Sequence, residues 1–186
     1  MKEQTLWVTR TGILLALLVV FQAAANSLGS TLVTGSVVNL LLILSVLLAG
    51  LPSGLVIACV SPVLAKLLGI GPLWSLIPFI IAGNVALALV WHCIGKKRER
   101  SGRGRQKMVL TLTAVAAGAG VKFFVLYLGI VKLAVPVLMR LPEKQAEGIS
   151  AMFSFPQLIT ALIGGALAAL LAGPLKRSLR RWSSNS

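Results

Sequence analysis

One lysine, Lys122, lies within the apolar stretch Met108–Val131. A stretch of that length is enough to cross a lipid bilayer, which takes about 20 apolar residues. A lysine at such depth costs about 2.5–3.5 kcal/mol on insertion scales. Something should offset that cost, and a bound anion in a polar cavity is the sharpest candidate. The lysine therefore points to a membrane protein that handles a small molecule.

Composition supports a membrane protein built from helices. Of the 186 residues, 57% are hydrophobic and 12% are charged, whereas soluble domains average about 45–50% apolar and about 25% charged residues. The alternating ten-residue segments of a transmembrane barrel are not seen. We expect an all-α membrane protein with six transmembrane helices and both termini in the cytoplasm. The predicted spans are Leu6–Ala25, Thr31–Ala49, Ser53–Leu68, Leu73–Ile94, Met108–Val131 and Phe155–Ala172.

The positive charges flank the apolar runs, as orientation signals do, so the net charge of +14 does not indicate nucleic-acid binding. The predicted loop 95–107 carries seven basic residues and one acid, and more basic residues follow Pro174. By the positive-inside rule, both regions are cytoplasmic. Loop 132–154, whose charges are mixed, is then extracellular. Residues 1–175 should form one transmembrane domain, followed by a basic cytoplasmic tail, 176–186.

An alternative for the first span is a cleaved signal peptide. Arg10, the apolar run Ile13–Phe21 and the alanines at 23–25 resemble one. Cleavage would leave five spans with the later loops on the same sides. We expect the first helix to be retained.

Several kinds of chemistry are excluded. None of the four acidic residues lies in a predicted span, which argues against carboxylate proton relays and Mg²⁺ clusters. With one histidine, His92, the chain cannot build a bis-histidine haem site or a histidine-rich zinc site alone. There is no phosphate-binding loop of the G-x-x-x-x-G-K-[ST] type. We therefore expect no enzymatic activity, no cofactor and no metal.

Polar side chains in the outer halves of the spans are the candidate substrate-binding residues. Asn39, Asn84, Lys122 and Gln157 are expected at depths similar enough for one cavity open to the outside. Nearby aromatic residues would stack on a flat ligand, namely Tyr127, Phe153 and Phe155. The alternatives remain open: hydrogen bonds between helices for the amides, and a structural contact to helix-end carbonyls or snorkelling for Lys122.

Other positions carry packing predictions. Cys59 and Cys93 fall in apolar runs and are interpreted as buried thiols without a disulfide. Trp74 and Trp91 are interpreted as membrane-interface anchors. Small residues every four positions on the last helix predict close helix packing: Ala161, Gly165, Ala169 and Gly173.

Three stretches make the chain resemble a known family, the substrate-binding S components of energy-coupling factor (ECF) vitamin transporters. They are TRTGILLALL (Thr9–Leu18), the pair Gly83-Asn84, and FSFPQLITALIGG (Phe153–Gly165). The size, the six spans and the basic loop between the fourth and fifth spans also agree, so the likeness covers almost the whole chain.

The resemblance implies a cell-membrane protein of a bacterium or archaeon that captures a vitamin or related micronutrient from outside. A transmembrane T component and two ABC ATPase subunits would energise uptake. The family's alanine-x-x-x-alanine docking motif maps to Gly12 and Ala16, with glycine replacing the first alanine. The outer-loop residues that would hold the ligand are Asn26–Thr34 and Met152–Gln157, and Lys122 suggests a carboxylate or phosphate on it. The alternative is a membrane scaffold or assembly protein without a small-molecule ligand.

Overall fold

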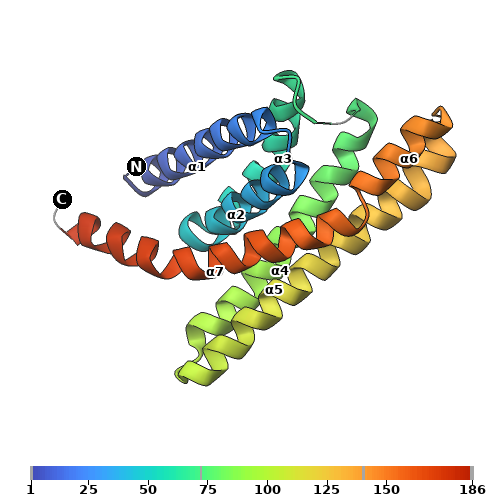
Figure 1. Cartoon of the computed structure of the whole chain (residues 1–186). Helices are drawn as coiled ribbons and strands as arrows, with labels where there is room; N and C mark the ends of the chain where they lie inside the picture. The colour runs from blue at the N-terminus through green and yellow to red at the C-terminus, as the bar shows by residue number, and fades with distance from the viewer. Residues whose placement is uncertain (1, 72, 140, 185–186) are drawn as a thin grey trace.

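The computed structural model describes residues 2–71, 73–139 and 141–184. Within these ranges the chain is helical throughout, without strands, and its long helices are joined by short connections (Figure 1). The elements in order are α1 (Lys2–Ser27), α2 (Thr31–Ala49), α3 (Leu51–Leu67), the 3₁₀ turn η1 (Trp74–Leu76), α4 (Ile77–Arg100), α5 (Gly104–Leu126), the π-helix η2 (Tyr127–Met139), α6 (Glu143–Met152) and α7 (Phe155–Ser184).

The all-helical membrane architecture predicted from the sequence is confirmed. Within the described ranges, five helical stretches are long and apolar enough to cross a bilayer: Gln4–Ser27, Thr31–Ala49, Trp74–Arg100, Gly104–Met139 and Glu143–Leu179. The predicted third span corresponds to α3, an apolar helix of 17 residues. It is shorter than the others because Gly50, with φ of 90°, precedes it and Gly69, with φ of 75°, follows it.

The helices alternate in direction along the bundle. Helices α4 and α5 run side by side as a long antiparallel pair, and α7 packs beside α2 and passes across that pair (Figure 1). The start of α1 and the far end of α7 lie on the same side of the molecule. We call the end of the bundle with the α4–α5 connection the basic end. The end with the α1–α2, α3–α4 and α6–α7 connections is the cavity end.

Two predicted loops are largely helical. Helix α4 continues to Arg100 and α5 begins at Gly104, so the predicted loop 95–107 shrinks to three non-helical residues. Its lysines and arginines are good helix formers, and basic residues in the last turn of α4 interact favourably with the helix C-terminus. The predicted loop 132–154 is mostly η2 and α6, apart from residue 140, which lies outside the described residues. The tail predicted from 176 continues α7 to Ser184, and residues 185–186 are also outside the described part.

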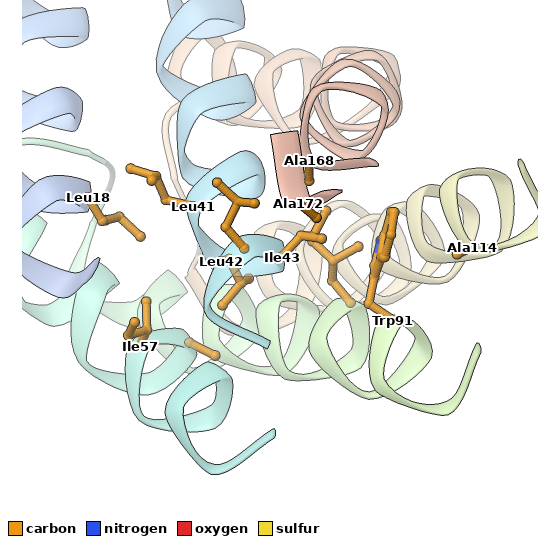
Figure 2. Packing of buried hydrophobic residues seen from close by; sticks show 12 residues of the cluster. Leu18, Leu41, Leu42, Ile43, Ile57, Trp91, Ala114, Ala168 and Ala172 are labelled. Atoms are coloured by element: carbon orange, nitrogen blue, oxygen red, sulfur yellow. The ribbon is translucent and has the colours of Figure 1, made fainter. Parts of the chain in front are cut away.

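The larger apolar core is formed by residues of α1, α2, α3, α4, α5 and α7 (Figure 2). Trp91 belongs to this core and is only 2% exposed, so its predicted role as an interface anchor is wrong. Glycines on two neighbouring helices make room for its ring: a Cβ atom would lie 2.9 Å from Trp91 Nε1 at Gly118, and 3.3 Å from Trp91 Cζ2 at Gly165. Trp74 is exposed, as an interface anchor would be.

The two cysteines are free, as predicted, but both are exposed on the surface of the bundle. The prediction that they are buried is therefore wrong. In a membrane protein an apolar run can face either lipid or the protein interior, because lipid tails are as apolar as a leucine side chain. Hydrophobicity therefore does not distinguish the two faces of such a helix.

The close contact between α2 and α7 depends on Gly164. A Cβ atom there would lie 2.6 Å from Asn39 Cβ and 2.7 Å from the backbone oxygen of Ser36. The neighbouring small residues Ala161 and Gly165 are buried in the bundle, which confirms the predicted packing role for this part of the row. The helices therefore touch backbone to backbone beside Asn39.

We predict that Gly164→Ala destabilises the protein by about 1–3 kcal/mol, because backbone atoms of α2 cannot move aside as a side chain would. Gly173→Ala on the same helix is the matched control, since a Cβ atom there meets nothing within 4 Å. Thermal unfolding in detergent compares the two variants. Equal melting temperatures for both would show that the close contact is not needed.

Candidate functional site

A cavity of about 360 Å³ opens at the cavity end of the bundle. Its mouth is formed by the α1–α2 connection, the residues that follow α3 and the α6–α7 connection. Its floor is formed by the middle of α2, the first third of α4 and the last turns of α5. Its polar lining residues are Gln22, Asn26, Ser30, Thr31, Thr34, Asn39, Ser61, Asn84, Lys122 and Gln157. Its apolar lining residues are Val38, Pro62, Ile70, Ile80, Leu126, Met152 and Phe153.

Lys122 lies on the floor, between two asparagines from other helices. Its Nζ donates hydrogen bonds to Asn39 Oδ1 at 2.5 Å and to Asn84 Oδ1 at 2.7 Å. The exposed fractions are 4% for Lys122, 1% for Asn39 and 2% for Asn84. The lysine therefore reaches neither helix-end carbonyls nor the membrane surface, which were the structural alternatives considered for it.

The hydrogen bonds continue from Asn39 into α7. Asn39 Nδ2 donates to Thr160 Oγ1 at 3.3 Å, and that hydroxyl donates to the backbone oxygen of Gln157 at 3.1 Å. A single network thus joins α7, α2, α5 and α4. It fixes the asparagine so that its oxygen, and not its NH₂ group, faces Lys122.

Close contact between α4 and α5 sets the position of Asn84. A Cβ atom at Gly83 would lie 2.9 Å from the side chain of Leu126, so the glycine lets α5 approach. The next residue, Asn84, then reaches Lys122 across the same interface. In the pair Gly83-Asn84, the glycine therefore lets α5 approach α4, and the asparagine accepts the hydrogen bond from Lys122.

The floor is suited to hold an anion. A lysine ammonium has three N–H donors, and the two asparagines accept two of them. Among the described residues that line the cavity, none is acidic. The positive charge is therefore stabilised by neutral dipoles but not neutralised, and a carboxylate or phosphate entering from the mouth would meet both the charge and the third donor.

Pro62 interrupts the hydrogen bonding of α3 beside the cavity. Pro62 lies inside this helix and lines the cavity. Because proline has no N–H, the carbonyl four residues earlier lacks its usual helical partner. Ser61, beside it, is buried and also lines the cavity.

Five of the seven residues predicted to bind substrate line the cavity: Asn39, Asn84, Lys122, Phe153 and Gln157. The predicted outer-loop stretches Asn26–Thr34 and Met152–Gln157 also contribute lining residues.

Tyr127 and Phe155 do not line the cavity. Tyr127 stacks on Phe123 with ring centroids 5.6 Å apart, and Lys132 Nζ lies 5.6 Å from its ring centroid. Phe155 is 63% exposed. Tyr127 follows Lys122 by five residues, and Phe155 precedes Gln157 by two. At these spacings the side chains of a helix point in different directions. Nearness in sequence therefore does not bring the two rings to the floor.

Sequence reasoning missed three polar contributors: Gln22, Ser61 and Thr160. Each had a detectable signal. Gln22 is a polar residue in an apolar run, Ser61 precedes the intrahelical Pro62, and Thr160 follows Gln157 by three positions, on the same helical face.

The predicted docking residues lie away from the cavity. Gly12 and Ala16 are exposed on α1, and a Cβ atom at Gly12 would meet nothing within 4 Å. The opposite face of α1 is held against α3, where Thr11 Oγ1 donates to Ser53 Oγ at 3.0 Å. This small-residue surface is therefore open to another subunit.

We predict that Asn84→Leu lowers the free energy of unfolding by about 1.5–3 kcal/mol, because the buried ammonium loses an acceptor. In a Lys122→Met background the same change should cost less, since the charge is gone. Thermal unfolding of the wild type, the two single variants and the double variant gives the coupling energy. Asn26→Leu, at an exposed position on the mouth, is the control. A coupling near zero would contradict the hydrogen bond.

Comparison with known proteins agrees with this geometry. No curated protein and no solved structure shows a significant match. A family model described as "ECF transporter, substrate-specific component" matches residues 7–175, which is nearly the whole chain. The chain belongs to the substrate-specific components of ECF transporters, which are multi-pass membrane subunits and not enzymes.

Proposed function

We propose that this chain is the substrate-binding subunit of an ECF-type ABC importer. In this role it captures a small anionic vitamin or related micronutrient from outside the cell, for uptake driven by ATP hydrolysis in partner subunits. The observation that carries the proposal is Lys122, buried between Asn39 and Asn84 on the floor of an open cavity.

Cavity size and lining support a small ligand. Ligand pockets range over about 300–1,000 Å³, and this cavity, at about 360 Å³, is near the lower limit. Apolar side chains such as Ile80, Leu126 and Phe153 would cover the body of the ligand. Its acidic group would reach Lys122. Pantothenate and niacin fit this description more closely than a larger folate-like acid.

Charge placement supports the direction of capture. The basic residues between α4 and α5 and those after Pro174 lie at the end opposite the cavity. By the positive-inside rule that end faces the cytoplasm. The cavity then opens to the outside of the cell membrane, and both termini are cytoplasmic.

The energy would come from partner subunits. We propose that the exposed surface around Gly12 and Ala16 docks to the transmembrane T component, which connects this chain to two ABC ATPases. A glycine and an alanine one turn apart let a partner helix approach closely. Exposed apolar side chains on the same helix, including Val8, Ile13 and Val20, would extend the contact.

Ligand identity is tested first by mass spectrometry of small molecules extracted from the purified protein. We expect a stoichiometric acid. We then predict that Lys122→Met weakens binding of that acid roughly 10- to 100-fold, because a charge-assisted hydrogen bond is lost. Calorimetric titration measures the affinities. Lys132→Met is the matched control, since Lys132 is exposed and outside the cavity.

A neutral analogue provides a second control. If the ligand is niacin, nicotinamide keeps the ring and removes the charge, so it should bind the wild-type protein weakly. Equal affinity for acid and amide, or full affinity in Lys122→Met, would refute an anionic ligand. If no small molecule is extracted from the protein and no member of a vitamin panel binds, the result would favour the alternative, a membrane scaffold or assembly protein.

We predict that Ala16→Leu reduces co-purification with the T component severalfold, because the larger side chain keeps the partner helix away. Ligand binding should be unchanged, since Ala16 lies outside the cavity. Ala24→Leu makes the same change at an exposed site about 12 Å farther along α1. Equal loss of partner in both variants would argue against docking at this surface.

A further inference from the structure

A second cavity, of about 430 Å³, lies at the basic end of the bundle, and we call it the basic cleft. The last turns of α4, the first turns of α5 and the segment of α7 around Pro174 surround it. Its charged lining residues are Arg98, Glu99, Lys107, Lys176 and Arg177, and its uncharged ones are Leu47, Gly95, Ala172 and Gly173.

The basic cleft holds more positive than negative charge. Four of its lining residues are cationic and one is acidic. Lys176 Nζ donates to Glu99 Oε1, which compensates one charge. Among the described residues, no ion pair is made by the other three cations, Arg98, Lys107 and Arg177.

Arg98 shows the strongest sign of a missing partner. Its Nε atom is buried and has no hydrogen-bond acceptor among the described residues. A buried donor left unsatisfied is expensive, and this one belongs to a guanidinium whose planar fork matches a phosphate. An anion in the cleft would accept from Arg98 and lie close to Lys107 and Arg177.

We propose that the basic cleft binds the phosphate headgroup of an anionic membrane lipid. The cleft lies where the apolar runs of α4 and α7 give way to basic residues, which is the depth of the lipid phosphates. Leu47, Ala172 and Gly173 provide an apolar wall beside the charges. A lipid offers both a phosphate and an acyl chain, whereas a soluble phosphate offers only the first.

The test is native mass spectrometry of the full-length protein in detergent, titrated with phosphatidylglycerol or with phosphatidylcholine of the same acyl chains. We expect phosphatidylglycerol to bind at least roughly tenfold more tightly. The triple variant Arg98→Gln, Lys107→Gln, Arg177→Gln should lose that preference. The matched control removes three exposed charges outside the cleft through the changes Lys96→Gln, Lys97→Gln and Arg105→Gln. This control should change the preference for phosphatidylglycerol by no more than about threefold.

A single substitution tests the same proposal in case the triple variant does not fold. Arg177→Gln alters an exposed residue and should lower the preference by a few-fold, with an unchanged melting temperature. No preference in the wild-type protein, or an equal loss in the control, would overturn the proposal.

Two further results would assign the cleft to something else. Displacement of the lipid by equal concentrations of glycerol 3-phosphate or inorganic phosphate would identify a site for a soluble anion. Unchanged lipid binding in the triple variant, together with lost co-purification of the energising subunits, would identify a protein-docking surface. Either result overturns the lipid assignment without affecting the proposed vitamin cavity.

Discussion

The buried ammonium of Lys122 is the constraint on which the arrangement of helices depends. Its charge is met by the oxygens of Asn39 and Asn84, which come from two other helices. Gly83 lets α4 approach α5 closely where Asn84 meets Lys122, and Gly164 lets α7 approach α2 closely beside Asn39. The protein thus places a cation within a candidate membrane span by surrounding it with fixed dipoles, and not with an acid that would neutralise it.

Acidic residues are scarce, and this leaves an excess of positive charge at both ends of the bundle. With four acids against eighteen lysines and arginines, most cations cannot be paired within the chain. At the cavity end, one cation is surrounded by amides on the floor of a small pocket. At the basic end, several line a wider cleft with one carboxylate among them. We propose that both sites attract anions, one from solution and one from the bilayer.

The errors of the sequence-based predictions have common physical causes. Trp91 was assigned to the membrane interface because tryptophans concentrate there, but glycines on two other helices create space for it in the core. Cys59 and Cys93 were assigned to the interior because they lie in apolar runs, yet such runs also face lipid. Tyr127 was assigned to the cavity by its nearness to Lys122, whereas helical phase turns it towards Phe123.

The sequence by itself determined the membrane class, the helical spans, the family resemblance and the polar residues of the cavity floor. These follow from local properties, because apolar length and isolated polar residues within it are visible along the chain. Only the tertiary structure decided which of those residues meet. Three features all depend on contacts between distant helices: Lys122 bonds to Asn39 and Asn84, Thr160 supports Asn39, and four cations gather in the basic cleft. Such contacts are set by packing geometry, which local sequence does not encode.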